Sequence, residues 1–130
     1  KLKNFLKGRD TILNKKNNIS FDKKNSILLS LEIKRKYDLI WLDGAHSFPH
    51  VAVDIANSLR LVNKNGVILC DDIIINAAKY DQYTAKDSLI TLNEFKLAKM
   101  INFKLFYKRI SKEFNAVPKE RKYIAFIEKV

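Results

Sequence analysis

Two stretches of the chain are apolar at nearly every position, and an amphipathic stretch separates them. Residues 37–42, YDLIWL, predict a strand covered on both faces, and residues 67–75, VILCDDIII, predict another. Between them, apolar residues recur at the spacing of a helix with one buried face: Val51, Ile55, Leu59 and Val62. Strand, helix and strand within about 35 residues predict a right-handed βαβ unit with parallel strands.

The helix between these strands has predicted ends of its own. Pro49 suits its first turn, where a missing backbone N–H costs nothing, and Asn65-Gly66 predicts its end. We expect Asp54, Asn57 and Arg60 on its outer face.

The pattern before residue 37 is weaker. Residues 1–9 predict the end of a helix that stops at Gly8, and DTILN after it predicts a short strand. A short helix is expected over residues 26–34. Its inward side chains are expected to be Leu28, Leu31 and Ile27.

The pattern after residue 83 predicts a helix and two strands. The helix spans TAKDSLITLNEFKLAKMI, with Thr84 and Asp87 in the places of a capping box. Residues 103–110 alternate apolar and basic side chains, which favours an edge strand, whereas residues 121–130 predict an interior strand. Pro118 and Asn115 between them allow an antiparallel hairpin.

Charge and composition narrow the classes of partner. The chain carries 25 Lys+Arg against 14 Asp+Glu, a net charge of +11, which attracts anions. Because the lysines are spread along the sequence and no RNA-recognition motif occurs, we do not predict a nucleic-acid partner. No apolar run approaches the roughly 20 residues that span a bilayer, so no membrane partner is predicted. The single cysteine excludes an internal disulfide and fits a cytoplasmic setting.

Carboxylates follow both strong strands. Asp43 ends the first strand, and Asp71 and Asp72 end the second. Ligands of open α/β sheets bind beyond the carboxyl ends of the strands, and carboxylates gathered there repel unless they share a proton or a cation such as Mg²⁺. A helix cap at Asp43 or Ser47 and a solvated strand end explain the same residues, so the residues alone leave both interpretations open.

The two histidines and the cysteine are the remaining candidates. His46 follows Asp43-Gly44, where an imidazole could serve as a general base or contact a ligand. His50, in the first turn of the predicted helix, is expected to be solvated. Cys70 is expected to be a small buried strand residue and not a nucleophile.

Residues 37–72 resemble the second half of class I S-adenosylmethionine-dependent methyltransferases. The likeness rests on the strand ending in Asp43-Gly44-Ala45-His46, the Lys64-Asn65-Gly66-Val67-Ile68 turn and the strand ending in Asp71-Asp72. The resemblance implies an α/β fold: a Rossmann-like methyltransferase sheet of parallel strands with a C-terminal antiparallel hairpin, whose last strand inserts into the sheet. Residues 1–130 then form one partial domain without the first strands, in which 37–130 hold strands four to seven and 1–36 match poorly.

The resemblance also implies a function and site residues. It implies methyl transfer from S-adenosylmethionine to a hydroxyl of a small molecule, with Asp43 and His46 on the acceptor side. In the metal-dependent O-methyltransferases of this superfamily, the matching positions would be Asp43, Asp71 and Asp72 as ligands of Mg²⁺. The net charge favours an anionic acceptor, such as a sugar phosphate or nucleotide sugar.

The chain departs from that family in lacking the glycine-rich motif that holds the cofactor. Its glycines are Gly8, Gly44 and Gly66, too far apart for such a motif. A fragment of a longer enzyme, a relative that has lost cofactor binding and a non-catalytic Rossmann-like interaction domain all explain this, and we expect the fragment. In an isolated chain, strand 37–42 would have an open apolar edge, which allows a homodimer.

Overall fold

The computed structural model describes residues 2–14, 18–75, 86–108 and 122–130. Its helices are α1 (Leu2–Asn14), the 3₁₀ helix η1 (Ser26–Leu28), α2 (Leu29–Glu32), α3 (His50–Leu61) and α4 (Lys86–Leu97). Its strands are β1 (Tyr37–Leu42), β2 (Val62–Ile74), β3 (Ile101–Tyr107) and β4 (Lys122–Lys129). None of these helices combines the length and the apolar character needed to cross a membrane.

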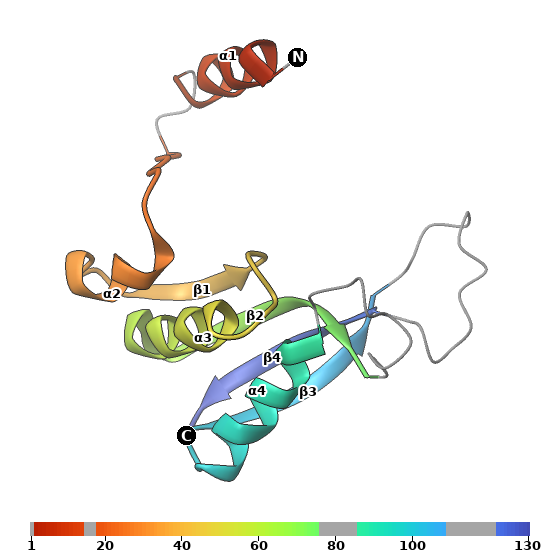
Figure 1. Ribbon diagram of the computed structural model, residues 1–130. Helices are drawn as coiled ribbons and strands as arrows, with labels where there is room; N and C mark the ends of the chain where they lie inside the picture. The colour runs from red at the N-terminus through yellow and green to blue at the C-terminus, as the bar shows by residue number, and fades with distance from the viewer. Residues whose placement is uncertain (1, 15–17, 76–85, 109–121) are drawn as a thin grey trace.

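The four strands form one mixed sheet in the order β1-β2-β4-β3 (Figure 1). β1 pairs with β2 in parallel, with Leu42 opposite Cys70, so the βαβ unit is confirmed. β4 is antiparallel to both β2 and β3 and lies between them. The predicted hairpin, with the last strand inserted into the sheet, is therefore confirmed, and so is the edge position of β3.

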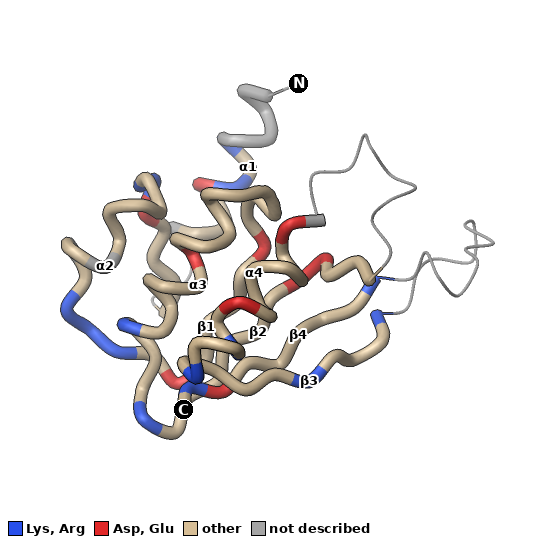
Figure 2. Tube along the Cα trace, turned by 60° about the horizontal axis from the view of Figure 1, so that its bottom comes forward, with Lys and Arg blue, Asp and Glu red and all other residues tan. Residues whose placement is uncertain are grey.

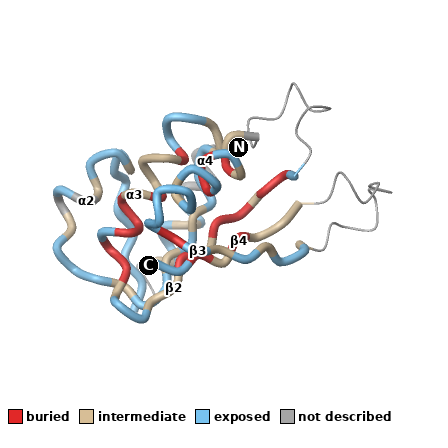
Figure 3. Tube along the Cα trace, turned by 90° about the horizontal axis from the view of Figure 1, so that it is seen from below, coloured by how far each residue is buried: buried red, intermediate tan, exposed pale blue. Residues whose placement is uncertain are grey.

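The core lies between the sheet and two helices on one of its faces. Val51, Ile55 and Leu59 of α3 are at most 5% exposed and pack against Ile68 and Cys70 of β2. α4 adds Leu92 to the same core. Figure 3 shows these buried segments on α3 and on the central strands. The apolar face predicted for α3 is thus confirmed.

The boundary between α3 and β2 differs from the prediction. The helix ends at Leu61, and β2 already begins at Val62, so Asn65-Gly66 lies inside the strand and not at a helix end. Gly66 is needed there because a Cβ atom would lie 3.0 Å from the carbonyl oxygens of Tyr37 and Asp38. The predicted helix end at Asn65-Gly66 is therefore wrong, because the glycine instead allows two strand backbones to lie close together.

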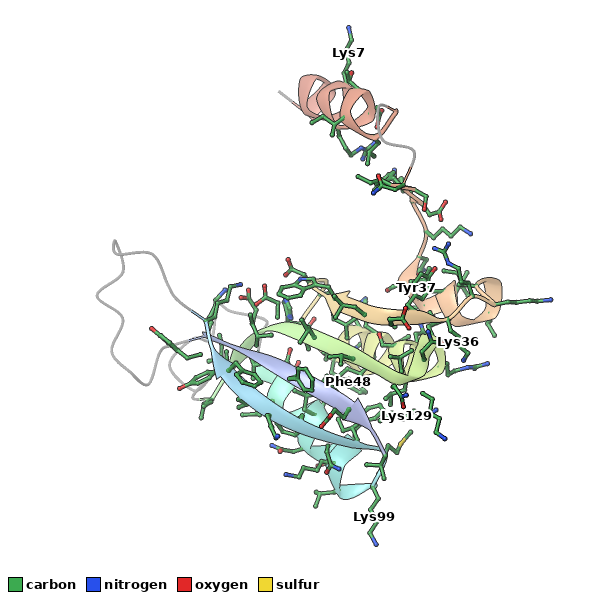
Figure 4. The ribbon with its side chains drawn as sticks, turned by 180° about the vertical axis from the view of Figure 1, so that it is seen from behind. Lys7, Lys36, Tyr37, Phe48, Lys99 and Lys129 are labelled. Carbon is green, nitrogen blue, oxygen red and sulfur yellow. The ribbon has the colours of Figure 1, made fainter. Side chains whose placement is uncertain are left out.

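Two lysines from other parts of the chain, one just before β1 and one at the end of β4, bind the carboxyl end of α3. Lys129 Nζ donates to the carbonyl oxygen of Leu59 at 3.4 Å, and Lys36 Nζ donates to that of Arg60. Figure 4 shows Lys36 and Lys129 at this end of the molecule. Ammonium groups stabilise the partial negative charge at a helix C-terminus, which compensates for the missing glycine stop.

The segments before β1 also depart from the prediction. α1 continues as a helix through Gly8 to Asn14, where a helix end and a strand had been predicted. η1 and α2 confirm a short helix, but Ile27, Leu28 and Leu31 are exposed, and not inward as predicted. Figure 1 shows α1 apart from the sheet.

The second face of the sheet is open at β1. Leu39 and Trp41 are 58% and 49% exposed, while Ile40 and Leu42 between and after them pack on the core. The prediction that both faces of this strand are covered is therefore wrong for the described residues. The apolar run of β1 provides more apolar surface than the described part of the chain buries.

Candidate functional site

Asp43 and His46 lie together at the carboxyl end of β1. The Nε2 atom of His46 is 3.8 Å from Oδ1 of Asp43. The Asp43 side chain is 59% exposed, whereas that of His46 is only 13% exposed. The structure therefore brings the two acceptor-side candidates into one pair, with the carboxylate open to a ligand and the imidazole mostly enclosed.

The segment between β1 and α3, residues 43–49, is called the Asp-His loop below. α3 holds its end, because the amides of Val51 and Val53 donate to the carbonyl oxygens of Ser47 and Pro49 at 3.1 Å. A Cβ atom at Gly44 would lie 3.3 Å from Oδ2 of Asp54 on α3. The glycine thus lets the loop pass close over the helix. Asp54, expected on the outer face, instead has one buried oxygen, Oδ1, without a hydrogen-bond partner among the described residues.

The second pair of candidates lies where β2 departs from regular geometry. The pairing of β2 with β4 shifts register between Cys70 and Ile73, and Asp72 between them has a φ of 55°. Such a bulge turns two consecutive side chains toward the same side, which a regular strand does not allow. Asp71 and Asp72 therefore both reach the same partner.

That partner is a pair of lysines from the hairpin. Lys108 Nζ lies 2.8 and 2.7 Å from the two carboxylate oxygens of Asp71 and 3.2 Å from Oδ1 of Asp72. Lys122 Nζ donates to Oδ2 of Asp72 at 2.6 Å. We call Asp71, Asp72, Lys108 and Lys122 the charge quartet. It joins β2 to the facing ends of β3 and β4.

The electrostatics of the charge quartet favour its ionised form. Burial by itself would raise the pKa of Asp72, but the hydrogen bonds from Lys122 and Lys108 outweigh it and hold that pKa below its usual range. The hydrogen bond to Asp71 raises the pKa of Lys108 above its usual range, against the opposing effect of burial. Both shifts favour the charged state on each side of the contact.

The arrangement does not fit a divalent cation held by Asp43, Asp71 and Asp72. No group of three or more His, Cys, Asp or Glu side chains in the described residues could hold a metal ion. The three donors of the Lys108 ammonium are directed at the oxygens that such an ion would need. Two positive charges already balance the two carboxylates, so Mg²⁺ binding by these residues stays a prediction that this geometry does not support.

The other candidates lie as expected. His50 is exposed at the start of α3. Cys70 is 1% exposed, and burial, together with Asp71, Asp54, Asp43 and Asp72, raises the pKa of its thiol to about 12. The expected burial of this cysteine is confirmed. Arg60 is exposed as predicted, whereas Asn57 is buried and donates to the carbonyl oxygen of Ser26 at 2.6 Å.

Four residues at this edge of the sheet were not identified from the sequence. Lys108 and Lys122 are two of 25 basic residues, and no local pattern connects them with carboxylates some 36 to 50 positions away. Asp87 and Ser88 bond the Asp-His loop from α4. Asp87 had been assigned to a capping box with Thr84, which lies outside the described residues.

The basic residues otherwise remain spread over many elements, with one run at Lys34–Lys36 just after α2 (Figure 2).

Comparison with known proteins connects this geometry to a family. A model of the methyltransferase domain matches residues 7–73, just over half of the chain. A search of curated proteins finds no match.

Solved methyltransferase structures share the fold at low sequence identity. A putative O-methyltransferase from Klebsiella pneumoniae aligns with 85% of this chain and 49% of its own, at 10% identity and a TM-score of 0.56. The O-methyltransferase TomG from Streptomyces achromogenes, solved with SAM, aligns with 82% of this chain and 47% of its own, at 10% identity and a TM-score of 0.54. A putative rRNA-methylase from Clostridium thermocellum aligns with 95% of this chain and 67% of its own, at 15% identity and a TM-score of 0.58.

These likenesses show the Rossmann-like methyltransferase fold, and the chain spans about half the length of the first of these structures. The family match includes β1, the Asp-His loop with Asp43 and His46, α3, and most of β2 with Asp71 and Asp72. The sheet order, with β4 between β2 and β3, is the order that the resemblance implied. The chain belongs to the methyltransferase-domain family.

Proposed function

We propose that this chain supplies the acceptor side of an S-adenosylmethionine-dependent methyltransferase that methylates a hydroxyl of a small molecule. The observation that carries the proposal is the Asp43–His46 pair at the carboxyl end of β1. Ligands of open α/β sheets bind in this place. In the charge quartet, by contrast, Lys108 and Lys122 already bind the carboxylates of Asp71 and Asp72, which makes those carboxylates less available to a ligand.

His46 is the proposed general base. A hydroxyl is a poor nucleophile until its proton is removed, and a neutral imidazole can accept that proton as the new C–O bond forms. Asp43, whose Oδ1 is 3.8 Å from Nε2, then stabilises the imidazolium or contacts the hydroxyl directly. As the acceptor oxygen is methylated, its proton would pass to the imidazole of His46.

The cofactor, when bound, supplies the electrophilic methyl group. The described residues include no glycine-rich cradle for it, because Gly44 lies against Asp54 and Gly66 against β1. The residues of this chain therefore fit the acceptor side of the reaction. Alignment of acceptor and methyl group accounts for much of the rate, so the position of the Asp-His loop matters more than strong acid–base chemistry.

The acceptor is proposed to be a small anionic molecule. The net charge of +11 favours anions in general, and a sugar phosphate or nucleotide sugar combines a hydroxyl with that charge. This part of the proposal is tested by the choice of acceptors in the assay and does not follow from the fold.

The test is transfer of a labelled methyl group by the chain, or by the longer protein if it is part of one. S-adenosylmethionine is supplied with a panel of neutral and phosphorylated hydroxyl compounds. His46→Gln is expected to lower kcat by a factor of roughly 10² to 10⁴, as for loss of a general base. Asp43→Asn is expected to lower it as well while the fold is kept.

His50→Gln is the matched control, because it removes the other histidine of the chain, which is exposed four residues further on. It should leave kcat unchanged. Equal activity of His46→Gln and His50→Gln would remove His46 from the mechanism. Absence of both cofactor binding and methyl transfer in the complete protein would refute the function itself.

A second candidate function is a non-catalytic interaction domain, and the open face of β1 favours it. Leu39 and Trp41 are half exposed, and no other described strand pairs with the outer edge of β1. Strands that border solvent usually carry lysine or proline as protection, and β1 carries neither. Analytical ultracentrifugation of wild type and Trp41→Lys distinguishes the two functions. A stable dimer lost in the variant, together with no cofactor binding, would favour the interaction domain.

A further inference from the structure

We infer that Asp87 and Ser88 of α4 are positioning residues, which fix the backbone of the Asp-His loop and so hold His46 for removal of the acceptor proton. The inference rests on the proposed methyl-transfer function and extends it to a helix that carries no residue of the Asp43–His46 pair. Both residues lie in the first turn of α4, about forty positions after the loop.

Asp87 binds the loop just before α3. Its Oδ2 atom accepts the backbone N–H of Phe48 at 2.9 Å. Phe48, labelled in Figure 4, is 69% exposed, so packing of its side chain does not hold this residue in place. A charged acceptor makes a stronger hydrogen bond than a neutral one, and here it compensates for the missing apolar contact.

Ser88 binds the loop at His46 itself. The Ser88 side chain is fully buried, and its Oγ donates to the carbonyl oxygen of His46 at 3.3 Å. Serine within a helix more often bonds a carbonyl of its own helix four residues earlier. Here the hydroxyl reaches a different segment, so it fixes the backbone that carries the imidazole.

α3 and α4 therefore hold successive positions of the same short loop. Amides of α3 donate to the carbonyl oxygens of Ser47 and Pro49, and α4 binds the loop at His46 and Phe48. A loop ordered in this way before the ligand arrives loses little further conformational entropy when the acceptor binds. The imidazole, already only 13% exposed and 3.8 Å from Asp43, keeps the position that proton removal requires.

The test compares Asp87→Ala, Asp87→Asn and Ser88→Ala with a matched control, Thr91→Val. Thr91 is on the same helix and is 8% exposed, so Thr91→Val also removes a buried hydroxyl from α4. Asp87→Asn keeps an oxygen that can accept the Phe48 amide and should restore most of what Asp87→Ala loses.

Amide hydrogen exchange and ¹⁵N relaxation measure the order of the Asp-His loop independently of methyl transfer. The Phe48 amide should exchange roughly tenfold faster or more in Asp87→Ala, as for loss of a hydrogen bond to a charged acceptor. In Ser88→Ala, the order parameters of residues 45–47 should fall toward those of a flexible segment. Thr91→Val should leave both measurements as in wild type.

Activity then links the loop to the reaction. Asp87→Ala and Ser88→Ala should lower kcat about tenfold to a hundredfold, while KM for S-adenosylmethionine changes less than about twofold. An active wild type whose kcat and loop dynamics are unchanged by either substitution overturns the positioning role. A complete protein with a protected Phe48 amide but neither cofactor binding nor methyl transfer refutes the proposed function instead, so the two failures are distinguishable.

Discussion

Lys108→Met is the substitution that tests the charge quartet most directly. The Lys108 ammonium contacts both oxygens of Asp71, at 2.8 and 2.7 Å, and Oδ1 of Asp72 at 3.2 Å. Methionine keeps the unbranched apolar stem and removes only the charge and the donors. Asp71, whose side chain is 6% exposed, then loses the ammonium group that binds both of its carboxylate oxygens.

The magnitude follows from burial on the two sides of the contact. Removing one partner of a fully buried ion pair costs about 3 to 5 kcal/mol, and a surface pair contributes about 1 kcal/mol or less. Asp71 is buried while Lys108 is 36% exposed, and Lys122 still binds Asp72, so the value lies between those limits. We expect a loss of about 2 kcal/mol, equivalent to a fall in Tm of roughly 6 to 10 °C for a chain of this length.

The pH dependence should change in a defined direction. The lowered pKa of Asp72 stabilises the fold above the pKa of an unfolded aspartate, about 3.9, and that stability is lost as the pH falls through the folded pKa. The raised pKa of Lys108 stabilises the fold below about 10.4, and that part is lost as the pH rises through its folded value. The free energy of unfolding of wild type should therefore exceed that of Lys108→Met between about pH 4 and 10. The two values should converge below and above this range.

Urea unfolding followed by circular dichroism measures this difference across the pH range. Lys104→Met is the control, because Lys104 is an exposed lysine of the same strand, β3. A cycle with Asp71→Asn isolates the coupling between the two residues, expected at about 1 to 2 kcal/mol. Equal losses for Lys108→Met and Lys104→Met, or a difference that does not vary with pH, would refute the reasoning.

Three further outcomes are expected. Cys70, with burial raising its pKa to about 12, should not react with a disulfide reagent at neutral pH until the protein unfolds; rapid labelling of the folded chain would contradict this. Gly66→Ala should cost about 1 to 3 kcal/mol in urea unfolding, because a Cβ atom meets Val62 Cγ2 at 2.7 Å, whereas Gly8→Ala, with nothing within 4 Å, should be neutral or stabilising. Mn²⁺ titration followed by electron paramagnetic resonance should detect no ion bound by Asp71; binding that Asp71→Asn abolishes would restore the metal site.

The βαβ unit was predictable because its signals are local and strong. The apolar face of α3 shows in the spacing of Val51, Ile55 and Leu59, and no tertiary contact is needed to recognise it. The end of α3 was not predictable in the same way. A glycine that follows a helical pattern commonly marks the helix end. Here, however, the carbonyl oxygens of Tyr37 and Asp38 on the neighbouring strand leave no room for a side chain at Gly66. The sequence shows a glycine at this position, but it does not show which neighbouring backbone leaves no room for a side chain.

In the candidate site, too, the local features were predictable and the contacts with distant residues were not. Asp43 and His46 are three positions apart, and the structure brings them together at 3.8 Å, as the strand end suggested. The prediction for Asp71 and Asp72 followed the same rule of strand ends, but it could not include a bulge or two lysines from a distant hairpin. Repulsion between carboxylates was the correct physical problem. In the structure, the ammonium groups of Lys108 and Lys122 balance the two carboxylates. No local sequence pattern connects these lysines with Asp71 and Asp72.

This difference changes what the edge of the sheet can do. A metal shared by Asp43, Asp71 and Asp72 would have joined β1 and β2 into one acceptor site and made the reaction depend on an ion. Instead, the charge quartet fixes β2 against the hairpin, while the Asp43–His46 pair stands beside it in a loop held by α3 and α4. Under the proposed function, catalysis and stability then depend on different residues. Lys108→Met should therefore lower stability and leave the proposed chemistry intact, whereas Ser88→Ala should lower the rate at a smaller cost in stability, about 1 kcal/mol for one neutral hydrogen bond.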